Sequence, residues 1–345
     1  MTSPASAMDV QGPLLELLDR EFSPEGMRRL LGVVGDQIPS QVLAHALQQP
    51  LRSVFARRGK GFRGRLVATS YALAGGRDPI AKELPVLLEI LHAGSLVVDD
   101  IEDDSDSRRG APSLHVIYGT PAALNAGNWL YFWALALVER LAIPEATQLR
   151  ILRRMSRAML ACHFGQALDL SVAVDQLARP DVPLVVRAAT QLKTGRLMQL
   201  AAEIGALAAG GDDAQVSALA AFGCRLGTGL QMLDDWGGLT SPNRRHKGFE
   251  DLRLGRMTWP WAWAAEQASD VDFARLRDLA RKVRVGRAPA ERVAAGLVGI
   301  IEPSARGRVH RHLADALDEL ARVLGPSDPL LTLKLEIARL ERSYD

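Results

Sequence analysis

Apolar side chains recur with helical spacing along most of this 345-residue chain, and no segment alternates convincingly between apolar and polar residues. Alternation with a period of two marks a half-buried strand, and the Asn-Gly dipeptide typical of tight hairpins does not occur either. Alanine, leucine and arginine favour helices, and aromatic residues make up only 5% of the chain. The sequence therefore predicts an all-α fold, with successive helices joined by short loops in one large bundle.

The composition argues against several classes of function. With 48% hydrophobic and 24% charged residues, the chain has an ordinary globular composition. Its net charge is +2, and the arginines are interspersed with acidic residues instead of forming a basic stripe, so nucleic acid is not an expected partner. No uninterrupted apolar run reaches the roughly 18 residues of a membrane-spanning helix.

The N-terminus and the cysteines indicate the organisation and the compartment. Residues 1–11 lack a basic start followed by an apolar run, so we expect no signal peptide and predict this segment to be disordered. Residues 12–345 contain no obvious linker and are predicted to form a single domain. Cys162 and Cys224 lack the spacing of metal ligands, which favours reduced thiols in a cytoplasmic protein.

An acidic stretch follows the apolar helical segment 83–98. If that helix continues, Asp99 and Asp103 lie one turn apart on one face, with Cβ atoms roughly 5–6 Å apart. Carboxylates this close repel each other unless water surrounds them or a divalent cation lies between them, and Mg²⁺ is typically held by one or two carboxylates plus substrate phosphate. Arg108 and Arg109 follow, and arginine binds phosphate oxygens bidentately. Taken alone, the stretch fits a solvated loop equally well.

A second pair of carboxylates, Asp234 and Asp235, ends another apolar helix, predicted over about 213–235. The polar segment 237–248 is predicted to be a loop, and it supplies Lys247. Two acidic helix ends facing each other across a bundle would hold Mg²⁺ ions that clamp a diphosphate. The second pair therefore favours a diphosphate site over a solvated loop.

Together these features resemble the trans-isoprenyl diphosphate synthases, the polyprenyl synthetase family. The match runs in order from about residue 59 to residue 260, and the combination is specific although each motif alone is weak. The matching segments are Gly59-Lys60 with Arg63, Glu89 with His92, Asp99-Asp100-Ile101-Glu102-Asp103, Arg108-Arg109-Gly110, Gly165-Gln166 with Asp169-Leu170, Lys193-Thr194, Gln231 with Asp234-Asp235, and Lys247 with the segment from Asp251 to Pro260.

The resemblance implies a helical bundle of the isoprenoid synthase type with a central apolar pocket beneath the aspartates. It also implies a Mg²⁺-dependent condensation of an allylic prenyl diphosphate with isopentenyl diphosphate, in a homodimer for which the apolar segment 121–141 is a candidate interface. The residues implied in catalysis are Asp99, Asp100, Asp103, Asp234 and Lys193, of which Asp99, Asp103 and Asp234 would coordinate Mg²⁺. The residues implied in substrate binding are Lys60, Arg63, His92 and Arg109 for isopentenyl diphosphate, Arg108, Lys193, Lys247 and Arg256 for the allylic diphosphate, and Thr194 and Gln231.

The helix before the first aspartates predicts the length of the product. Gly94 and Ser95, one turn before Asp99, are both small, whereas bulky aromatic residues at these positions end the pocket early in related enzymes. Small residues favour geranylgeranyl diphosphate or a longer product, with Leu91 as a deeper floor. The Gly94→Phe substitution is therefore expected to shorten the product.

The chain also departs from the family pattern. Gly238 stands where a third aspartate is usual, Asn128 replaces an aspartate and Val98 replaces a polar residue. The segment that begins at Lys60 lacks the family's arginine at Gly61 and proline at Gly64. These departures leave two other functions open: a terpene cyclase on the same scaffold, and a non-catalytic partner subunit.

Tryptophans bear on the choice between these alternatives. A cyclase would use aromatic rings such as those of Trp236, Trp259, Trp261 and Trp263 to stabilise a carbocation, although the helical spacing of Trp259 and Trp263 also fits a packed core. The retained isopentenyl diphosphate segment argues against a cyclase. The intact carboxylates at positions 99 and 103 argue against a purely regulatory subunit.

Overall fold

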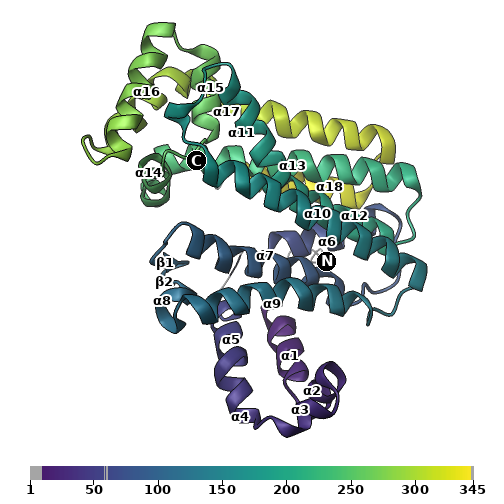
Figure 1. Cartoon of the computed structure of the whole chain (residues 1–345). Coiled ribbons are helices and arrows are strands. Elements are labelled where there is room, and N and C mark those ends of the chain that lie inside the picture. Colours follow the sequence, from purple (N-terminus) through teal and green to yellow (C-terminus); the bar gives the residue numbers. More distant parts are fainter. Residues whose placement is uncertain (1–9, 58, 60, 343–345) are drawn as a thin grey trace. The chain divides into compact units, whose positions relative to one another are not determined.

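The structure, a computed structural model, describes residues 10–57, 59 and 61–342. Its regular structure is almost entirely helical (Figure 1), which confirms the predicted all-α class. Within this described part of the chain the only strands are β1 (Ser107–Arg108) and β2 (Ala111–Pro112), which pair antiparallel. None of the described helices is long and apolar enough to cross a membrane.

Contacts within the chain define two compact units. Unit 1 contains the residues up to 153 together with 204–210, and unit 2 contains 154–203 and the residues from 211 onward. The predicted single domain over 12–345 is thus described as two units. The predicted disordered segment 1–11 falls mainly on residues outside the described part, and α1 begins at its last residue, Gln11.

Short helices lead up to a long pair in unit 1, and long helices dominate unit 2. The helices of unit 1 are α1 (Gln11–Glu21), α2 (Pro24–Leu31), α3 (Val33–Gln37), α4 (Ser40–Leu43), the π-helix η1 (Ala44–Gln48), α5 (Gln49–Phe55), α6 (Phe62–Leu73), α7 (Glu83–Glu102), α8 (Leu114–Tyr118) and α9 (Thr120–Val138). Those of unit 2 are the 3₁₀-helix η2 (Val174–Gln176), α11 (Asp181–Thr190), the π-helix η3 (Gln191–Gly195), α13 (Asp213–Thr240), α14 (Arg245–Leu254), α15 (Trp259–Gln267), α16 (Asp270–Arg284), α17 (Ala290–Leu324) and α18 (Asp328–Arg342). Helices α10 (Glu145–Ser171) and α12 (Arg196–Ala208) have residues in both units.

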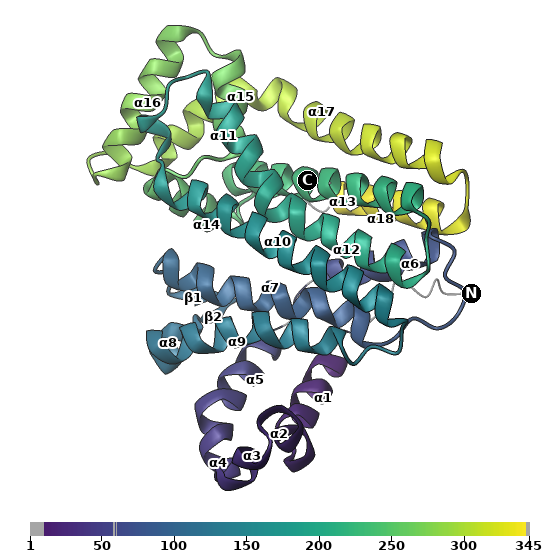
Figure 2. The same cartoon turned by 45° about the vertical axis from the view of Figure 1, so that its right-hand side comes forward.

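Helix α7 is the centre of unit 1, and it runs beside α9 in both views (Figures 1 and 2). A Cβ atom added to Gly94 of α7 would lie 2.9 Å from the carbonyl oxygen of Gly127 on α9, so the two backbones are in close contact. Leu87, Leu88 and Ile90 of α7 are fully buried. Each such side chain contributes about 1.5–3 kcal/mol relative to an exposed one. This packing fixes the C-terminal end of α7, where the first aspartates lie.

A buried carboxylate ties α1 and α2 to α9 in unit 1. Glu21 at the end of α1 accepts hydrogen bonds from the Trp133 indole at 2.7 Å and from Arg29 at 2.9 Å. Arg140, just after α9, donates to both carboxylate oxygens. Burial disfavours the charged carboxylate, but the donors Arg140, Trp133 and Arg29 outweigh it and lower the pKa of Glu21. Glu21 is therefore ionised at neutral pH although it is buried.

Helix α13 is the centre of unit 2 and packs along α17 (Figures 1 and 2). It continues to Thr240, and α14 begins at Arg245, so the predicted loop over 237–248 is wrong except for a short connection. The predicted helix end relied on Gly237 and Gly238, which are poor helix formers. Trp236 and Leu239 are buried, and this packing offsets the low helix propensity of the two glycines.

Candidate functional site

The first acidic stretch forms the end of α7, as predicted. The backbone N–H of Asp103 donates to the carbonyl of Asp99 at 2.9 Å, so helical geometry extends to Asp103. Asp99 and Asp103 are both half-buried. Asp104 then adopts a left-handed conformation with φ of 51° and turns the chain away from the helix axis. The two predicted metal-binding carboxylates therefore share one face of α7, one turn apart.

A small hairpin follows the aspartates, at the place where the segment Arg109-Gly110-Ala111-Pro112 indicates a turn in the sequence. Arg108 pairs with Ala111 across the β1–β2 ladder, which leaves Arg109 and Gly110 as a two-residue turn. Both turn residues have positive φ, 55° and 78°, as a type I′ turn requires. Gly110 and Pro112 are a sequence signal for a turn, whereas the left-handed conformation of Arg109 is uncommon for this residue. The hairpin places Arg108 and Arg109 beside the end of α7.

Arg108 pairs with the carboxylates of the first motif. Its Nε donates to Asp100 Oδ1 at 2.7 Å, and its Nη2 lies 3.3 Å from Asp99 Oδ2. The Asp100 carboxylate is buried, and its charged partner there is the Arg108 guanidinium. Burial alone would lower the pKa of Arg108, but the hydrogen bond to Asp100 and the charge of Asp99 outweigh it and raise that pKa. A predicted phosphate-binding cation thus lies next to a predicted metal ligand.

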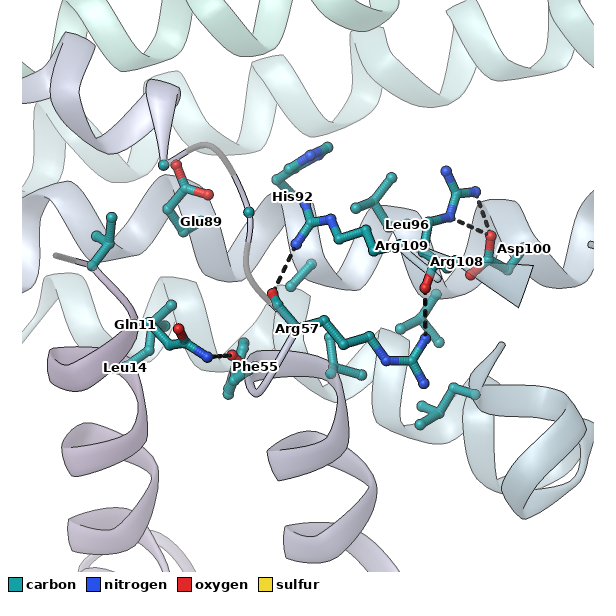
Figure 3. Close-up of a pocket in the computed structure, with 17 residues that line it drawn as sticks. Gln11, Leu14, Phe55, Arg57, Glu89, His92, Leu96, Asp100, Arg108 and Arg109 are labelled. Carbon is teal, nitrogen blue, oxygen red and sulfur yellow. Dashed lines mark hydrogen bonds and ion pairs between the residues drawn. The ribbon is translucent and has the colours of Figure 1, made fainter. Parts of the chain in front are cut away.

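A pocket of about 380 Å³ opens beside this ion pair in unit 1 (Figure 3). Three arginines line it, Arg57, Arg108 and Arg109, against two acidic residues, Glu89 and Asp100. The pKa of Arg109 is lowered, mainly because the guanidinium is partly buried. The negative charge of Glu89 opposes this shift, whereas the positive charges of Arg108 and Arg57 add to it. Positive charge is therefore concentrated at one wall of the pocket, which is suited to an anion.

Arg57 is a pocket residue that the sequence analysis missed. Its guanidinium donates to the carbonyl of Pro112 at 2.7 Å and to that of Arg108 at 3.5 Å, as Figure 3 shows for Arg108. Arg109 in turn donates to the carbonyl of Arg57 at 3.2 Å. The Arg57 guanidinium therefore holds the hairpin by donating to backbone carbonyls of the two strands. The basic run 57–65 was a visible signal, but only the fold shows which of its members reaches the hairpin.

Most residues predicted to bind isopentenyl diphosphate can be located. His92 and Arg109 line the pocket, and a Cβ atom on Gly59 would lie 2.9 Å from Arg109 Nη1, so this segment also approaches the site. Lys60 lies outside the described residues. Arg63 is half-buried on α6 and does not belong to the described lining of the pocket.

The glycines that depart from the family pattern have local reasons. Gly61 lines the pocket with a left-handed φ of 58°, and a Cβ atom there would lie 2.8 Å from the Val10 side chain. The backbone N–H of Gly64 donates to Glu89 at 3.0 Å, and a proline at position 64 would have no N–H for this bond.

The predicted residues for chain length separate into two groups. Gly94 contacts Gly127 of α9, and a side chain there would extend into space that α9 occupies, so its role in chain length stays a prediction that this contact does not favour. Leu91 is buried, and Ser95 is half-buried with its hydroxyl donating to the carbonyl of His92 at 2.9 Å. Ser95 and Leu91 lie one and two turns before Asp99 on α7 and remain candidates.

The second set of predicted residues lies in unit 2. The Lys193 ammonium is 2.6 Å from Asp169 Oδ2, which joins η3 to α10. This approach needs Gly165, because a Cβ atom there would lie 2.8 Å from Lys193 Cγ. Arg256 donates to the Asp169 carbonyl, and Lys247 is exposed on α14. The structure thus brings Lys193 and Arg256 to the same residue and leaves Lys247 at the surface.

A chain of hydrogen bonds connects η3, α13 and α15. Thr194 donates to Gln231 at 2.9 Å, and Gln231 donates to Asp235 Oδ1 at 2.7 Å. The backbone N–H of Trp259 donates to the other oxygen of Asp235 at 2.8 Å. Burial raises the pKa of Asp235 to about 7, even though these two hydrogen bonds lower it. Asp235 is thus half-buried, with both carboxylate oxygens hydrogen-bonded within the protein, while Asp234 is 55% exposed and pairs with Arg244 at 2.9 Å.

The tryptophans are part of the core. Trp236, Trp259, Trp261 and Trp263 are at most 4% exposed, and the rings of Trp259 and Trp263 have centroids 6.0 Å apart. The Trp259 indole donates to Thr190 at 3.1 Å. This arrangement favours the packing interpretation over an aromatic surface for a carbocation. Unit 2 exposes apolar surface elsewhere, for example in a groove of about 530 Å³ lined by Leu160, Phe164, Leu168 and Leu192.

Comparison with known proteins decides the family. The family model described as polyprenyl synthetase matches residues 44–294. The chain belongs to the polyprenyl synthetase family. The sequence-based assignment to this family, and with it to prenyltransferases, is thereby confirmed.

Curated relatives and solved structures agree. The chain is 33% identical to the geranylgeranyl pyrophosphate synthase of Eremothecium gossypii over 62% of its own length and 68% of that enzyme. It is 29% identical to the geranylfarnesyl diphosphate synthase of Aeropyrum pernix, over 81% of its own length and 89% of that enzyme. The fold is similar to that of the Pyrococcus horikoshii geranylgeranyl pyrophosphate synthetase, with a TM-score of 0.74 and 24% identity over 96% of this chain and 99% of that one.

Proposed function

We propose that this polyprenyl synthetase elongates an allylic prenyl diphosphate with isopentenyl diphosphate and releases geranylgeranyl diphosphate or a longer product. The observation that carries the proposal is in unit 1: two carboxylates one turn apart, with Arg108 beside them and a pocket lined by Arg57, His92 and Arg109. Carboxylates for metal next to cations for phosphate are what diphosphate chemistry needs. The relatives from Eremothecium gossypii and Aeropyrum pernix, synthases of geranylgeranyl and geranylfarnesyl diphosphate, support the same product range.

The donor set fits Mg²⁺. Mg²⁺ keeps several waters and takes one or two carboxylates plus substrate phosphates, and Asp99 and Asp103 supply two carboxylates on one helix face. We therefore propose Asp99 and Asp103 as Mg²⁺ ligands in unit 1 and Asp234 in unit 2. Among the described residues, no group of three or more His, Cys, Asp or Glu side chains able to hold a metal ion occurs. The chemistry supplied by bound Mg²⁺ is neutralisation of the charge that builds up on the leaving diphosphate.

The side chains divide the remaining work between binding and charge stabilisation. In unit 1, Arg108 is held by Asp100 and so is pre-oriented to stabilise a diphosphate as the allylic C–O bond breaks. In unit 2, Lys193 is held by Asp169, and we propose for it the same kind of role toward a diphosphate. His92 and Arg109 hold the diphosphate of isopentenyl diphosphate, whose double bond attacks the allylic cation. The released diphosphate accepts the proton that is lost when the new double bond forms.

We also propose a cytoplasmic homodimer. Helix α9 lies in the segment predicted as an interface, and it exposes Phe132 at 69% and Leu124 at 41% although its other face is packed on α7. An apolar stripe of this kind is suited to a second copy of the chain. The thiols of Cys162 and Cys224 fit a reducing compartment. Sedimentation of the wild type and of Phe132→Glu tests the dimer, and a sedimentation coefficient that is the same for both would contradict this interface.

The test of the activity is incubation with Mg²⁺ and farnesyl or geranylgeranyl diphosphate, with and without isopentenyl diphosphate. The products are analysed before and after phosphatase treatment. A longer diphosphate that forms only with isopentenyl diphosphate supports elongation. A hydrocarbon or alcohol released without isopentenyl diphosphate would contradict it in favour of a cyclase, and no product with either primer would favour a partner subunit.

Product length can be tested on α7. Ser95→Phe is expected to shift the product toward shorter chains, because a phenyl ring one turn before Asp99 takes up room on the same face of the helix. Gly94→Phe serves as the contrast. It is expected to lower the midpoint of thermal unfolding without a clean shift in product length, because α9 leaves no room at this position. An unchanged product with a folded Ser95→Phe variant would remove Ser95 from the chain-length role.

A further inference from the structure

The two adjacent aspartates of the second acidic motif, near the end of α13, differ in their exposure to solvent. Asp234 is 55% exposed. Asp235 is turned inward, where the amide of Gln231 and the backbone N–H of Trp259 occupy its two oxygens. Asp235 thus connects α13 to the first turn of α15, and Asp234 is the carboxylate of this pair that a ligand in solvent can reach.

No carboxylate follows one turn later, and the backbone of α14 explains why. Position 238 lies four residues after Asp234 and so on the same face of α13. A Cβ atom on Gly238 would lie 3.1 Å from the Cα atom of Gly248, and a Cβ atom on Gly248 would lie 2.2 Å from the carbonyl oxygen of Gly238. The two helices touch backbone to backbone, so α14 occupies the place where a side chain at position 238 would begin.

The same approach of α14 brings an arginine to the exposed carboxylate. Arg244, the residue before α14, lies with its Nη1 2.9 Å from Asp234 Oδ1. Its side chain is 28% exposed. A guanidinium carries five N–H donors in a planar fork. Because part of the Arg244 side chain is exposed, phosphate oxygens can reach its guanidinium and accept charge-assisted hydrogen bonds beside Asp234.

We propose that Arg244 is a substrate-binding residue, which binds the diphosphate of the allylic substrate beside Asp234. It supplies the positive charge that a further carboxylate at position 238 would otherwise supply through a bound cation. This inference rests on the proposed function, since it assigns Arg244 to the substrate of that reaction. Arg244 would thus provide near the end of α13 the positive charge that a carboxylate with a bound metal ion would provide at the end of α7.

The test is binding of inorganic pyrophosphate, measured by calorimetry at several Mg²⁺ concentrations in the full-length protein. Arg244→Gln is expected to weaken binding about tenfold at a given Mg²⁺ concentration, because losing a charge-assisted hydrogen bond costs about 1.4 kcal/mol or more. Arg245→Gln is the matched control, because Arg245 is the next residue and is exposed. The control is expected to bind pyrophosphate as the wild type does.

Thermal unfolding separates binding from support of the fold. The midpoint of Arg244→Gln is expected to stay close to that of the wild type, since partly exposed ion pairs contribute little to stability. Equal pyrophosphate binding in Arg244→Gln and Arg245→Gln would overturn the proposal. So would a loss of binding accompanied by a large drop in the unfolding midpoint, which would make Arg244 a structural residue.

A parallel elongation assay keeps this inference apart from the proposed function. If the wild type makes no longer prenyl diphosphate but binds pyrophosphate in a manner that depends on Arg244, the proposed function fails and the binding site remains. If the wild type elongates its primer and Arg244→Gln binds pyrophosphate and elongates equally well, the assignment of Arg244 fails and the proposed function remains.

Discussion

Helices α7 and α13 both carry adjacent negative charges near their C-terminal ends, and different partners balance these charges. Each carries two adjacent aspartates near its C-terminal end, and each has an arginine that pairs with the first of them, Arg108 with Asp99 and Arg244 with Asp234. In α7 the second aspartate, Asp100, also pairs with Arg108. In α13 the second aspartate is held by the neutral donors Gln231 and Trp259 instead.

The position one turn later differs most. Helix α7 has Asp103 there, whereas α13 has Gly238 packed against α14. The first helix end therefore offers a pair of carboxylates to a cation, and the second offers a carboxylate with an arginine. The comparison shows that a repeated acidic motif need not repeat its ligand set, because the packing of a neighbouring helix decides which positions can carry a side chain.

Removing the carboxylate at position 103 tests the difference most strongly. Asp103→Asn is expected to lower the rate of prenyl transfer about a hundredfold, a loss comparable to removing one group that stabilises charge in a transition state. The rate is measured with farnesyl and isopentenyl diphosphate while Mg²⁺ is titrated, and the variant is expected to need more Mg²⁺.

Asp106→Asn is the control for this substitution, because Asp106 is exposed in the same segment and its backbone carbonyl, which accepts from Ser113, is unchanged. It is expected to keep the wild-type rate. If Asp103→Asn kept that rate too, α7 would function with a single solvent-facing carboxylate, and the contrast with α13 would disappear.

Two hydrogen-bonded acids extend the comparison between the two units. Glu21 in unit 1 is buried and Asp235 in unit 2 is half-buried, yet the pKa of Glu21 is lowered and that of Asp235 is raised to about 7. The cause of the difference is the type of donor. Arg140 and Arg29 bring positive charge to Glu21, whereas the donors to Asp235 are neutral and Asp234 and Asp251 add negative charge nearby.

Glu21→Gln tests this reasoning through stability. Because folding lowers the pKa of Glu21 below its usual value of 4.5, the stabilisation is fully present above pH 4.5 and is lost as the pH falls through the lowered pKa. The variant is expected to lose about 2–3 kcal/mol of unfolding free energy at pH 7, where the wild type holds a charged, hydrogen-bonded carboxylate.

Urea unfolding of both proteins between pH 7 and pH 3 measures the effect. The free energies of the wild type and of Glu21→Gln are expected to converge as the medium becomes acidic. A difference that stayed constant over this range would mean that the Glu21 carboxylate contributes through its shape and not through its charge.

Local periodicity was enough to predict α7 and the spacing of Asp99 and Asp103, because both depend on residues close together in the sequence. Features that depend on distant partners were missed. Gly110 and Pro112 indicate a turn, but the hairpin also relies on Arg57, more than fifty residues earlier, and this contact has no local signal. Gly94 appeared to be a pocket residue because the sequence does not show that Gly127 of α9 lies against it.

The extension of α13 through Gly238 was also missed, because it depends on packing against residues of α14 that follow later in the chain. A substitution at this contact has the smallest of the expected effects. Gly248→Ala is expected to cost about 1–2 kcal/mol, because its Cβ atom would lie 2.2 Å from the carbonyl oxygen of Gly238 and the two helices would have to separate. Gly299→Ala on α17 is the matched control. It is a helical glycine with open space around its Cβ position, so alanine there is expected to stabilise the protein by about 0.5–1 kcal/mol.

Thermal unfolding of the two variants is therefore expected to shift in opposite directions. Two shifts of the same sign would mean that helix propensity, and not the contact between α13 and α14, determines the residue at position 248. Steric exclusion by α14 would then no longer account for the missing carboxylate at position 238.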